Sequence, residues 1–220
     1  MNAWAAETAP GVPLRIGVYG GAFDPPHLAH RVLAQSAIQQ LALDRLLILP
    51  TGQAWHKERA LTDASHRLAM CLLAFGDLPN TQIDPRETRR NGPSYTADTL
   101  AELHREWPDA RFFLILGADQ LLAFQTWMRW PEVLQRAQLA VANRATHIGE
   151  DALDDAHHSA DLSSVGVPFV PLDMPLTNIS ATAVRARFGR PMGRAGAHVA
   201  LVSPAVASYI SQHHLYQNPS

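Results

Sequence analysis

The stretch Ile16-Gly17-Val18-Tyr19-Gly20-Gly21-Ala22-Phe23-Asp24-Pro25-Pro26-His27-Leu28-Ala29-His30 decides the fold of this chain. It begins as a short apolar run of strand character, continues through paired glycines and an Asp-Pro-Pro turn, and ends where a helix is expected to begin. Glycines let the backbone approach an anion closely, and a helix start offers free N–H groups and a positive dipole end. His27 and His30 are three residues apart, so on a helix they share a face. This opening stretch therefore predicts a phosphate-binding turn.

Other interpretations of the opening stretch have less support. It contains neither the Gly-x-Gly-x-x-Gly fingerprint of dinucleotide-binding folds nor the Gly-Lys-Ser/Thr of a P-loop. His27 and His30 could ligate a metal, but helical zinc pairs usually stand four residues apart with a glutamate between them, so no metal site is predicted. The simplest alternative is a tight strand–helix turn that carries ordinary surface histidines.

The whole chain has the composition of a soluble globular protein. It has 220 residues, of which 47% are hydrophobic, and a formal net charge of -2. Such a charge argues against a nucleic-acid partner, and no apolar run is long enough to predict a membrane partner. The lone Cys71 excludes an internal disulfide and, without a recognisable signal peptide, indicates the cytoplasm. We expect a loose leader over residues 1–13 and a single domain over 14–217.

Beyond the opening stretch, predicted strands and helices alternate. Strands are expected over residues 14–19, 45–49, 83–87, 111–116, 138–142 and 168–172. Helices are expected over residues 27–41, 64–75, from Ser94 or Thr96 to 107, from Ser180 onward, and 204–213. This order predicts an α/β fold, a doubly wound and mainly parallel sheet with helices on both faces. Ligands bind such sheets at the carboxyl ends of the strands.

Three of the expected helix starts carry side chains that suit an anion. These donors are His27, His30, Ser94, Ser180, Thr182 and Arg185. Taken singly, the Ser94 and Ser180 starts are more simply explained as capped helices. Together the donors fit transfer of a nucleotidyl group between phosphates, because a phosphomonoester is already an anionic nucleophile and needs no general base. Fixed donors would lower the barrier by alignment and electrostatics, and Mg²⁺ would help to neutralise a triphosphate.

The opening stretch resembles the signature of the nucleotidyltransferases related to class I aminoacyl-tRNA synthetases. The matching pattern is Gly20-Gly21-x-Phe23-Asp24-Pro25-x-His27-x-x-His30. That superfamily usually has His-x-Gly-His, and here Ala29 stands in place of the glycine.

Three further blocks resemble the bacterial nicotinate-nucleotide adenylyltransferases. They are Glu87-x-x-Arg90-x-Gly92-x-Ser94-Tyr95-Thr96, Gly117-x-Asp119-x-Leu121-x-x-Phe124-x-x-Trp127-x-x-Trp130, and Ile179-Ser180-Ala181-Thr182-x-x-Arg185. The resemblance runs in order from about residue 16 to 216. It implies a Rossmann-like nucleotidyltransferase that transfers the adenylyl group of ATP to nicotinate mononucleotide, giving nicotinic acid adenine dinucleotide and pyrophosphate in NAD biosynthesis.

The resemblance also implies a role for each matching residue. The catalytic residues would be His27, His30 and Arg185, with His30 on the α-phosphate. The ATP-binding residues would be Gly20, Gly21, Phe23, Gly117, Asp119, Ser180 and Thr182. The residues that bind nicotinate mononucleotide would be Tyr95, Thr96, Trp127, His56 and Lys57. Ala54-Trp55 replaces the two prolines that usually precede the last pair. No protein ligand is implied for the Mg²⁺ that accompanies ATP.

Other functions remain to be distinguished. One is a different adenylyltransferase of the superfamily, such as the phosphopantetheine enzyme, although the Ser-Tyr-Thr and Trp-x-x-Trp blocks argue against it. Another is a nucleotide-binding regulator without turnover, and a third is a non-catalytic α/β interaction domain, which would not bind ATP. A homo-oligomer is left open.

Overall fold

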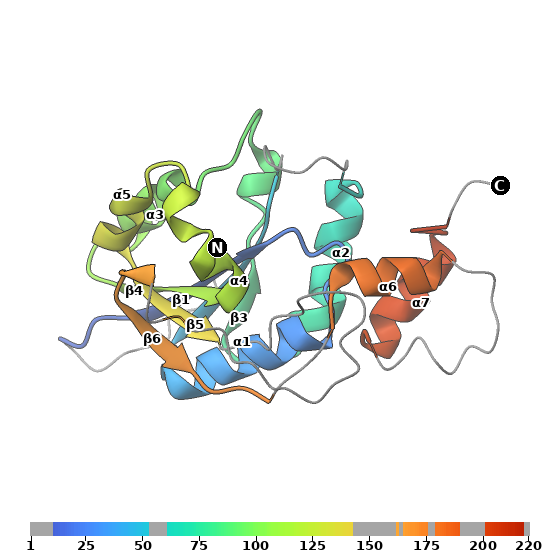
Figure 1. The fold of residues 1–220 in the computed structure, drawn as a ribbon, viewed down its shortest axis with the longest axis horizontal. Coiled ribbons are helices and arrows are strands. Elements are labelled where there is room, and N and C mark those ends of the chain that lie inside the picture. Colours follow the sequence, from blue (N-terminus) through green and yellow to red (C-terminus); the bar gives the residue numbers. More distant parts are fainter. Residues whose placement is uncertain are drawn as a thin grey trace.

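The computed structural model describes residues 11–52, 61–142, 162, 165–175, 179–189 and 201–217. In this part of the chain, six strands form one sheet in the order β3-β2-β1-β4-β5-β6, and every neighbouring pair is parallel (Figure 1). The strands are β1 (Arg15–Gly21), β2 (Arg45–Pro50), β3 (Thr81–Ile83), β4 (Arg111–Gly117), β5 (Gln138–Ala142) and β6 (Phe169–Leu172). The α-helices are α1 (Leu28–Gln40), α2 (Ala64–Phe75), α3 (Thr96–Glu106), α4 (Ala118–Leu122), α5 (Trp130–Arg136), α6 (Ala181–Phe188) and α7 (Pro204–Gln212). Two short 3-10 helices are η1 (Glu87–Arg89) and η2 (Phe124–Thr126).

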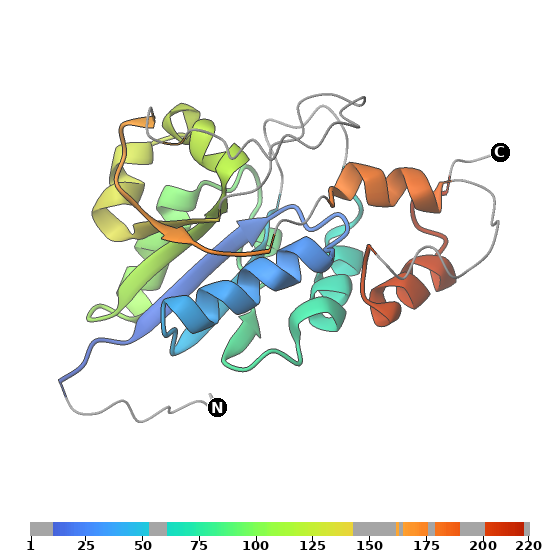
Figure 2. The ribbon, with the colours of Figure 1, turned by 60° about the horizontal axis from the view of Figure 1, so that its bottom comes forward.

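Each face of the sheet is covered by its own group of helices. Side chains of α1, α2, α6 and α7 share one hydrophobic core, and those of α3, α4 and α5 share the other. Figure 2 shows α6 and α7 beside α2, at one side of the sheet. Strand β2 divides its side chains between the two: Leu46 and Ile48 join the first core, and Leu47 and Leu49 join the second. The continuous apolar run of this strand therefore fits a sheet buried on both faces, as predicted.

The strand order reverses between β1 and β4, which lie side by side in the middle of the sheet. The chain builds outward from β1 to β3, returns to β4, and then builds outward on the other side. After β1 the chain enters α1 on one face, and after β4 it enters α4 on the other. Open α/β sheets bind ligands at such a reversal, beyond the carboxyl ends of the strands. Here those ends are Gly20-Gly21 and Gly117.

Several predicted elements and caps are confirmed. The expected ranges 64–75 and 138–142 coincide with α2 and β5. Asp63 caps α2 by accepting from the Ser65 N–H at 2.8 Å, and Ser180 caps α6 by accepting from the Ala183 N–H at 3.1 Å. These caps satisfy backbone donors that a helix start leaves unpaired.

Other predictions are wrong. The strand expected over residues 83–87 is β3 at Thr81–Ile83, and Glu87 begins η1 instead. The pairing stops because Pro85 has no N–H to donate, while Asp84 turns back to accept from the Arg86 N–H at 2.9 Å.

The start of α3 also differs from the prediction. Neither Ser94 nor Thr96 caps this helix: Tyr95 is its N-cap and makes no side-chain capping bond. The Ser94 hydroxyl donates to the Glu87 carbonyl at 3.3 Å instead. Between Gly117 and Gln138 the structure adds α4, η2 and α5, which the sequence did not predict because they are too short to show a period.

Some predictions fall outside the described residues. These are the roles implied for His56 and Lys57, and residues 1–10 of the expected leader. Among the helices that the structure describes, none combines the length and the apolarity needed to cross a membrane.

Candidate active site

The two histidines of the opening stretch lie together at the start of α1. Their rings are stacked, with centroids 3.6 Å apart and planes 20° apart. The backbone N–H of His27 donates to Nδ1 of His30 at 3.1 Å. Because Nδ1 of His30 is thereby an acceptor, the neutral ring carries its proton on Nε2. His30 can therefore present an N–H donor to a phosphate without first being charged.

The ring of Phe23 packs against the ring of His30. Phe23 was expected to line the nucleotide cleft, and the structure places its side chain in the core, 2% exposed. Its ring meets those of His30 and Tyr19 edge-on, at centroid distances of 5.2 and 5.4 Å. Ala29 is 3% exposed and belongs to the hydrophobic core that α1 shares with α2, α6 and α7. The methyl group that replaces the usual glycine is therefore buried in that core.

Helix α6 joins the same turn. Nη1 of Arg185 donates to the backbone carbonyl of Asp24 at 2.8 Å, and Nη2 donates to Oγ1 of Thr182 at 3.0 Å. The structure therefore brings the first and third expected helix starts together, although they are separated by about 160 residues in the sequence. Figure 2 shows α6 beside the end of β1 and the start of α1.

The backbone at the strand reversal leaves room for a ligand at one glycine. A Cβ built on Gly20 would meet no atom within 4 Å, and its φ lies outside the left-handed region. A Cβ on Gly21 would lie 3.1 Å from the Phe23 ring. On the neighbouring strand, Gly117 is the N-cap of α4, and the exposed Asp119 lies in the first turn of that helix. The expected ATP-binding glycines thus lie on adjacent strands of the sheet.

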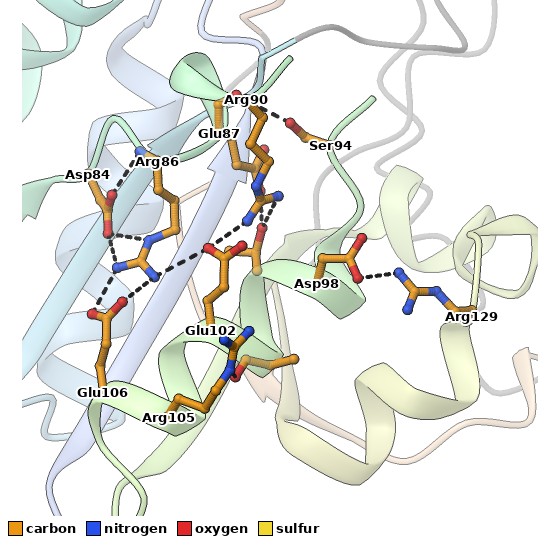
Figure 3. Close-up of polar contacts among 12 residues, drawn as sticks. Asp84, Arg86, Glu87, Arg90, Ser94, Asp98, Glu102, Arg105, Glu106 and Arg129 are labelled. Atoms are coloured by element: carbon orange, nitrogen blue, oxygen red, sulfur yellow. Dashed lines mark hydrogen bonds and ion pairs between the residues drawn. The ribbon is translucent and has the colours of Figure 1, made fainter. Parts of the chain in front are cut away.

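The expected mononucleotide pocket lies at the start of α3. Tyr95 and Thr96 form this start, and Trp127 follows η2. The two segments are held together by Arg129, whose guanidinium pairs with Asp98 at 2.5 Å (Figure 3). The same guanidinium lies 6.0 Å from the centre of the Tyr95 ring. Sequence reasoning missed Arg129, because nothing in the local pattern distinguishes it from an ordinary surface arginine.

Near the second predicted anion site, at the start of α3, an arginine is paired with a carboxylate of the protein itself. Arg90 precedes this helix start, and its guanidinium pairs with Glu102 at 2.8 Å and donates to the Thr99 hydroxyl at 3.0 Å (Figure 3). Thr99 in turn donates to the buried Glu87 carboxyl at 2.7 Å. Burial raises the pKa of Glu87, and the Thr99 donor opposes that rise. Arg90 therefore fixes η1 to α3.

Buried Arg67 ties together the loops that follow β1 and β2. Its guanidinium donates to the carbonyls of Ala22, Thr51 and Thr62 at 3.0, 2.7 and 2.8 Å. The side chain is only 2% exposed, and burial lowers its pKa. The sequence did carry a signal for it: Arg67 lies on the same helical stripe as Met70, Cys71 and Ala74, where only apolar residues are expected.

Among the described residues, no three His, Cys, Asp or Glu side chains are grouped to hold a metal ion. The donors that converge at the end of β1 are imidazole and guanidinium nitrogens. Mg²⁺ prefers oxygen ligands and keeps much of its water shell. The described side chains therefore do not fit a resident magnesium site and instead fit phosphate oxygens.

The open space at Gly20 gives a first prediction. Gly20→Ala is expected to leave the midpoint of thermal unfolding unchanged, because the methyl group meets nothing, yet to lower turnover by roughly tenfold by entering the ligand's space. Thermal unfolding and steady-state kinetics check this. Gly52→Ala is the matched control, since its Cβ would lie 2.2 Å from the Glu87 carbonyl oxygen and should lower the unfolding midpoint instead. A Gly20→Ala variant with wild-type kinetics would remove Gly20 from the site.

Comparisons with known proteins give matches over most of the chain. The family model described as cytidylyltransferase-like matches residues 18–187. A protein of Albidiferax ferrireducens named "Probable nicotinate-nucleotide adenylyltransferase" is 50% identical over 92% of this chain and 98% of its own length. A protein of Methylibium petroleiphilum with the same name is 42% identical over 93% of both chains.

A solved structure matches the fold at much lower identity. The nicotinic acid mononucleotide adenylyltransferase of Plasmodium falciparum, solved in complex with NaAD, has a TM-score of 0.75 and 16% identity, over 92% of this chain and 97% of that one. This likeness confirms the doubly wound, Rossmann-like fold.

Proposed function

The chain belongs to the nicotinate-nucleotide adenylyltransferases, and from this we propose that His27, His30 and Arg185 perform its chemistry at the carboxyl end of β1. The enzyme transfers the adenylyl group of ATP to nicotinate mononucleotide, giving nicotinic acid adenine dinucleotide and pyrophosphate in NAD biosynthesis. The contact between Arg185 and Asp24 carries this site assignment, because it joins α6 to the turn with both histidines.

The reaction needs alignment and charge stabilisation more than proton transfer. A phosphate oxygen of nicotinate mononucleotide attacks the α-phosphorus of ATP, the new P–O bond forms, and the bond to the β-phosphate oxygen breaks to release pyrophosphate. The nucleophile is already an anion at neutral pH, so a general base is unnecessary. The remaining barrier comes from the negative charge that gathers on the α-phosphate and on the leaving group, and fixed N–H donors stabilise this charge.

The donors can be assigned by their positions. His30 donates from Nε2 to the α-phosphate, since its Nδ1 already accepts from the His27 N–H. Arg185 lies on the α6 side with Thr182 and faces the leaving pyrophosphate. Ser180 keeps its oxygen on the Ala183 N–H and so acts mainly by holding the start of α6 in place. The positive end of this helix adds to the attraction for the triphosphate.

In this proposal ATP binds beyond the carboxyl ends of β1 and β4, where the strand order reverses. Gly20 and Gly21 allow the nucleotide close to β1, and Gly117 and Asp119 hold the adenosine beyond β4. Magnesium arrives on the triphosphate oxygens as part of the substrate and neutralises some of their charge.

Nicotinate mononucleotide lies across the start of α3. Trp127 and Tyr95 offer aromatic surfaces to the pyridine ring, and the first N–H groups of α3, at Thr96 and beyond, meet its carboxylate. Arg129 lies beside Tyr95; its side chain is paired with Asp98 but stays 39% exposed, so part of its charge remains available at this end of the pocket. His56 and Lys57, which follow β2 in the sequence, complete the proposed set.

The charge of Arg129 gives a second prediction. Arg129→Gln is expected to raise KM for nicotinate mononucleotide by about threefold to tenfold, the effect of losing one exposed favourable charge. KM for ATP should stay the same, and so should KM for nicotinamide mononucleotide, which has no carboxylate. Arg129→Lys keeps the charge and should recover most of the loss. Equal changes in KM for both mononucleotides would show that Arg129 only shapes the pocket.

The function is tested by offering the purified protein ATP together with one phosphate acceptor at a time and measuring pyrophosphate release. Nicotinate mononucleotide is expected to give the fastest release, with nicotinic acid adenine dinucleotide as the second product. Faster release with 4′-phosphopantetheine would assign the protein to a different adenylyltransferase. ATP binding by calorimetry without release from any acceptor would indicate a nucleotide-binding regulator.

A further inference from the structure

The end of the described chain reaches back to the opening stretch. Tyr216 follows α7, and its hydroxyl donates to Oδ1 of Asp24 at 2.7 Å. Asp24 is 2% exposed and stands three residues before His27. Tyr216 was not among the expected site residues, and nothing in the sequence near it points to the opening stretch.

Asp24 is held by three separate parts of the chain. Oδ1 accepts from Tyr216, Oδ2 accepts from the Thr62 N–H at 3.3 Å, and the backbone carbonyl accepts from Arg185 at 2.8 Å. The same residue therefore connects the C-terminal segment, the start of α2 and the arginine on α6. A shift of Asp24 would move Arg185 and the start of α1 relative to each other.

From these contacts we propose that Tyr216 is a positioning residue for adenylyl transfer, acting through Asp24 on Arg185 and on the His27–His30 pair. In this proposal Tyr216 acts through Asp24 and not by direct contact with a substrate. The inference rests on the proposed roles of Arg185 and the histidines. In chemical terms, one half-buried hydroxyl group near the C-terminus keeps donors from two helices aligned on the same phosphates.

A tyrosine suits this task because its hydroxyl remains a donor. Burial beside the Asp24 carboxylate raises the pKa of Tyr216 well above its usual range, so the phenol stays protonated at neutral pH. A buried carboxylate oxygen that loses its donor is costly, because its desolvation is no longer compensated. Removing the hydroxyl is therefore expected to displace Asp24 toward another donor.

The test compares two tyrosines of the same C-terminal region. Tyr216→Phe removes the hydroxyl on Asp24, and Tyr209→Phe removes one that contacts Nδ1 of His66 at 2.9 Å, away from the opening stretch. Tyr216→Phe is expected to lower kcat by about tenfold, as a small misalignment of reacting groups does, with KM for nicotinate mononucleotide nearly unchanged. Tyr209→Phe should keep the wild-type kcat. Assays are run well below the unfolding midpoint of each variant, where circular dichroism confirms that it is folded.

A double-mutant cycle separates positioning from general stability. Arg185→Lys removes the guanidinium that contacts both Asp24 and Thr182. In that background Tyr216 can no longer position this guanidinium through Asp24, so its removal should have a smaller effect. The loss of kcat in the double variant should then be smaller than the product of the two single losses. Independent losses that multiply would overturn the proposal, as would wild-type kcat in Tyr216→Phe or an equal loss in Tyr209→Phe. A wild-type protein that releases no pyrophosphate would instead refute the proposed function, whatever these variants do.

Discussion

Replacing His30 with alanine is expected to lower kcat by roughly 10²-fold or more while the protein keeps its fold. The size of this loss is that of removing one well-placed donor from a charged transition state. Of the proposed donors, His30 has its tautomer fixed by the His27 N–H and its ring held in edge-on contact with the ring of Phe23. Steady-state kinetics with ATP and nicotinate mononucleotide measure the effect, and circular dichroism checks the fold.

Two variants make the result for His30 specific. His30→Gln keeps an amide N–H in reach of the Nε2 position and should recover part of the lost turnover. His104→Ala removes a histidine of α3 that packs on Phe112, with ring centroids 4.5 Å apart, and should leave kcat unchanged. Near-normal turnover in His30→Ala would remove the catalytic assignment of this residue.

Replacing Arg67 with methionine is expected to lower the free energy of unfolding by about 2–4 kcal/mol. The reason is that carbonyls of Ala22, Thr51 and Thr62 lose their donor in a buried position, where each unpaired group costs about 1–3 kcal/mol and part of this is recovered by relaxation. Methionine keeps most of the side-chain length and removes only the donors and the charge. Chemical denaturation measures the loss.

The same change should also lower kcat, because Ala22 belongs to the opening stretch and its loop is no longer held to the loop after β2. Arg105→Met is the matched control on α3, where the guanidinium is exposed and, among the described residues, bonds to the Ala101 carbonyl of its own helix. That variant should change the unfolding free energy little. A stability of Arg67→Met equal to that of the control would mean that the two loops hold their positions without this side chain.

The sequence predicts the fold well where its signals are local. The opening stretch carries its strand, its glycine turn and its helix start within fifteen residues, and both its histidines lie where the pattern places them. Caps such as Asp63 and Ser180 are equally local, because the cap and the N–H that it accepts are two or three residues apart. The alternation of strands and helices then determines the parallel sheet and its crossovers.

Residues that act across the fold escaped prediction. Arg129 and Tyr216 each owe their position to partners that only the folded chain brings near, so neither periodicity nor spacing marks them. Arg67 is different, because its place on the apolar stripe of α2 marks it, although the sequence does not show its partners. Arg90 shows the same limit: it is a basic residue near a predicted helix start, but its partner Glu102 on α3 takes up the charge. The sequence shows which chemical group a side chain carries, but it does not show which distant residue that group will contact.

The central claim is that donors from α1 and α6 act together on the phosphates of ATP at the end of β1. It is tested most directly by following ATP labelled in its α-phosphate through one turnover with nicotinate mononucleotide, in the wild type and in His30→Ala, Arg185→Ala and the double variant. We expect the label to appear in nicotinic acid adenine dinucleotide, each single variant to be at least about tenfold slower, and the double variant to lose less than the product of the two losses. Label released as AMP or ADP, or wild-type rates in both single variants, would contradict the claim.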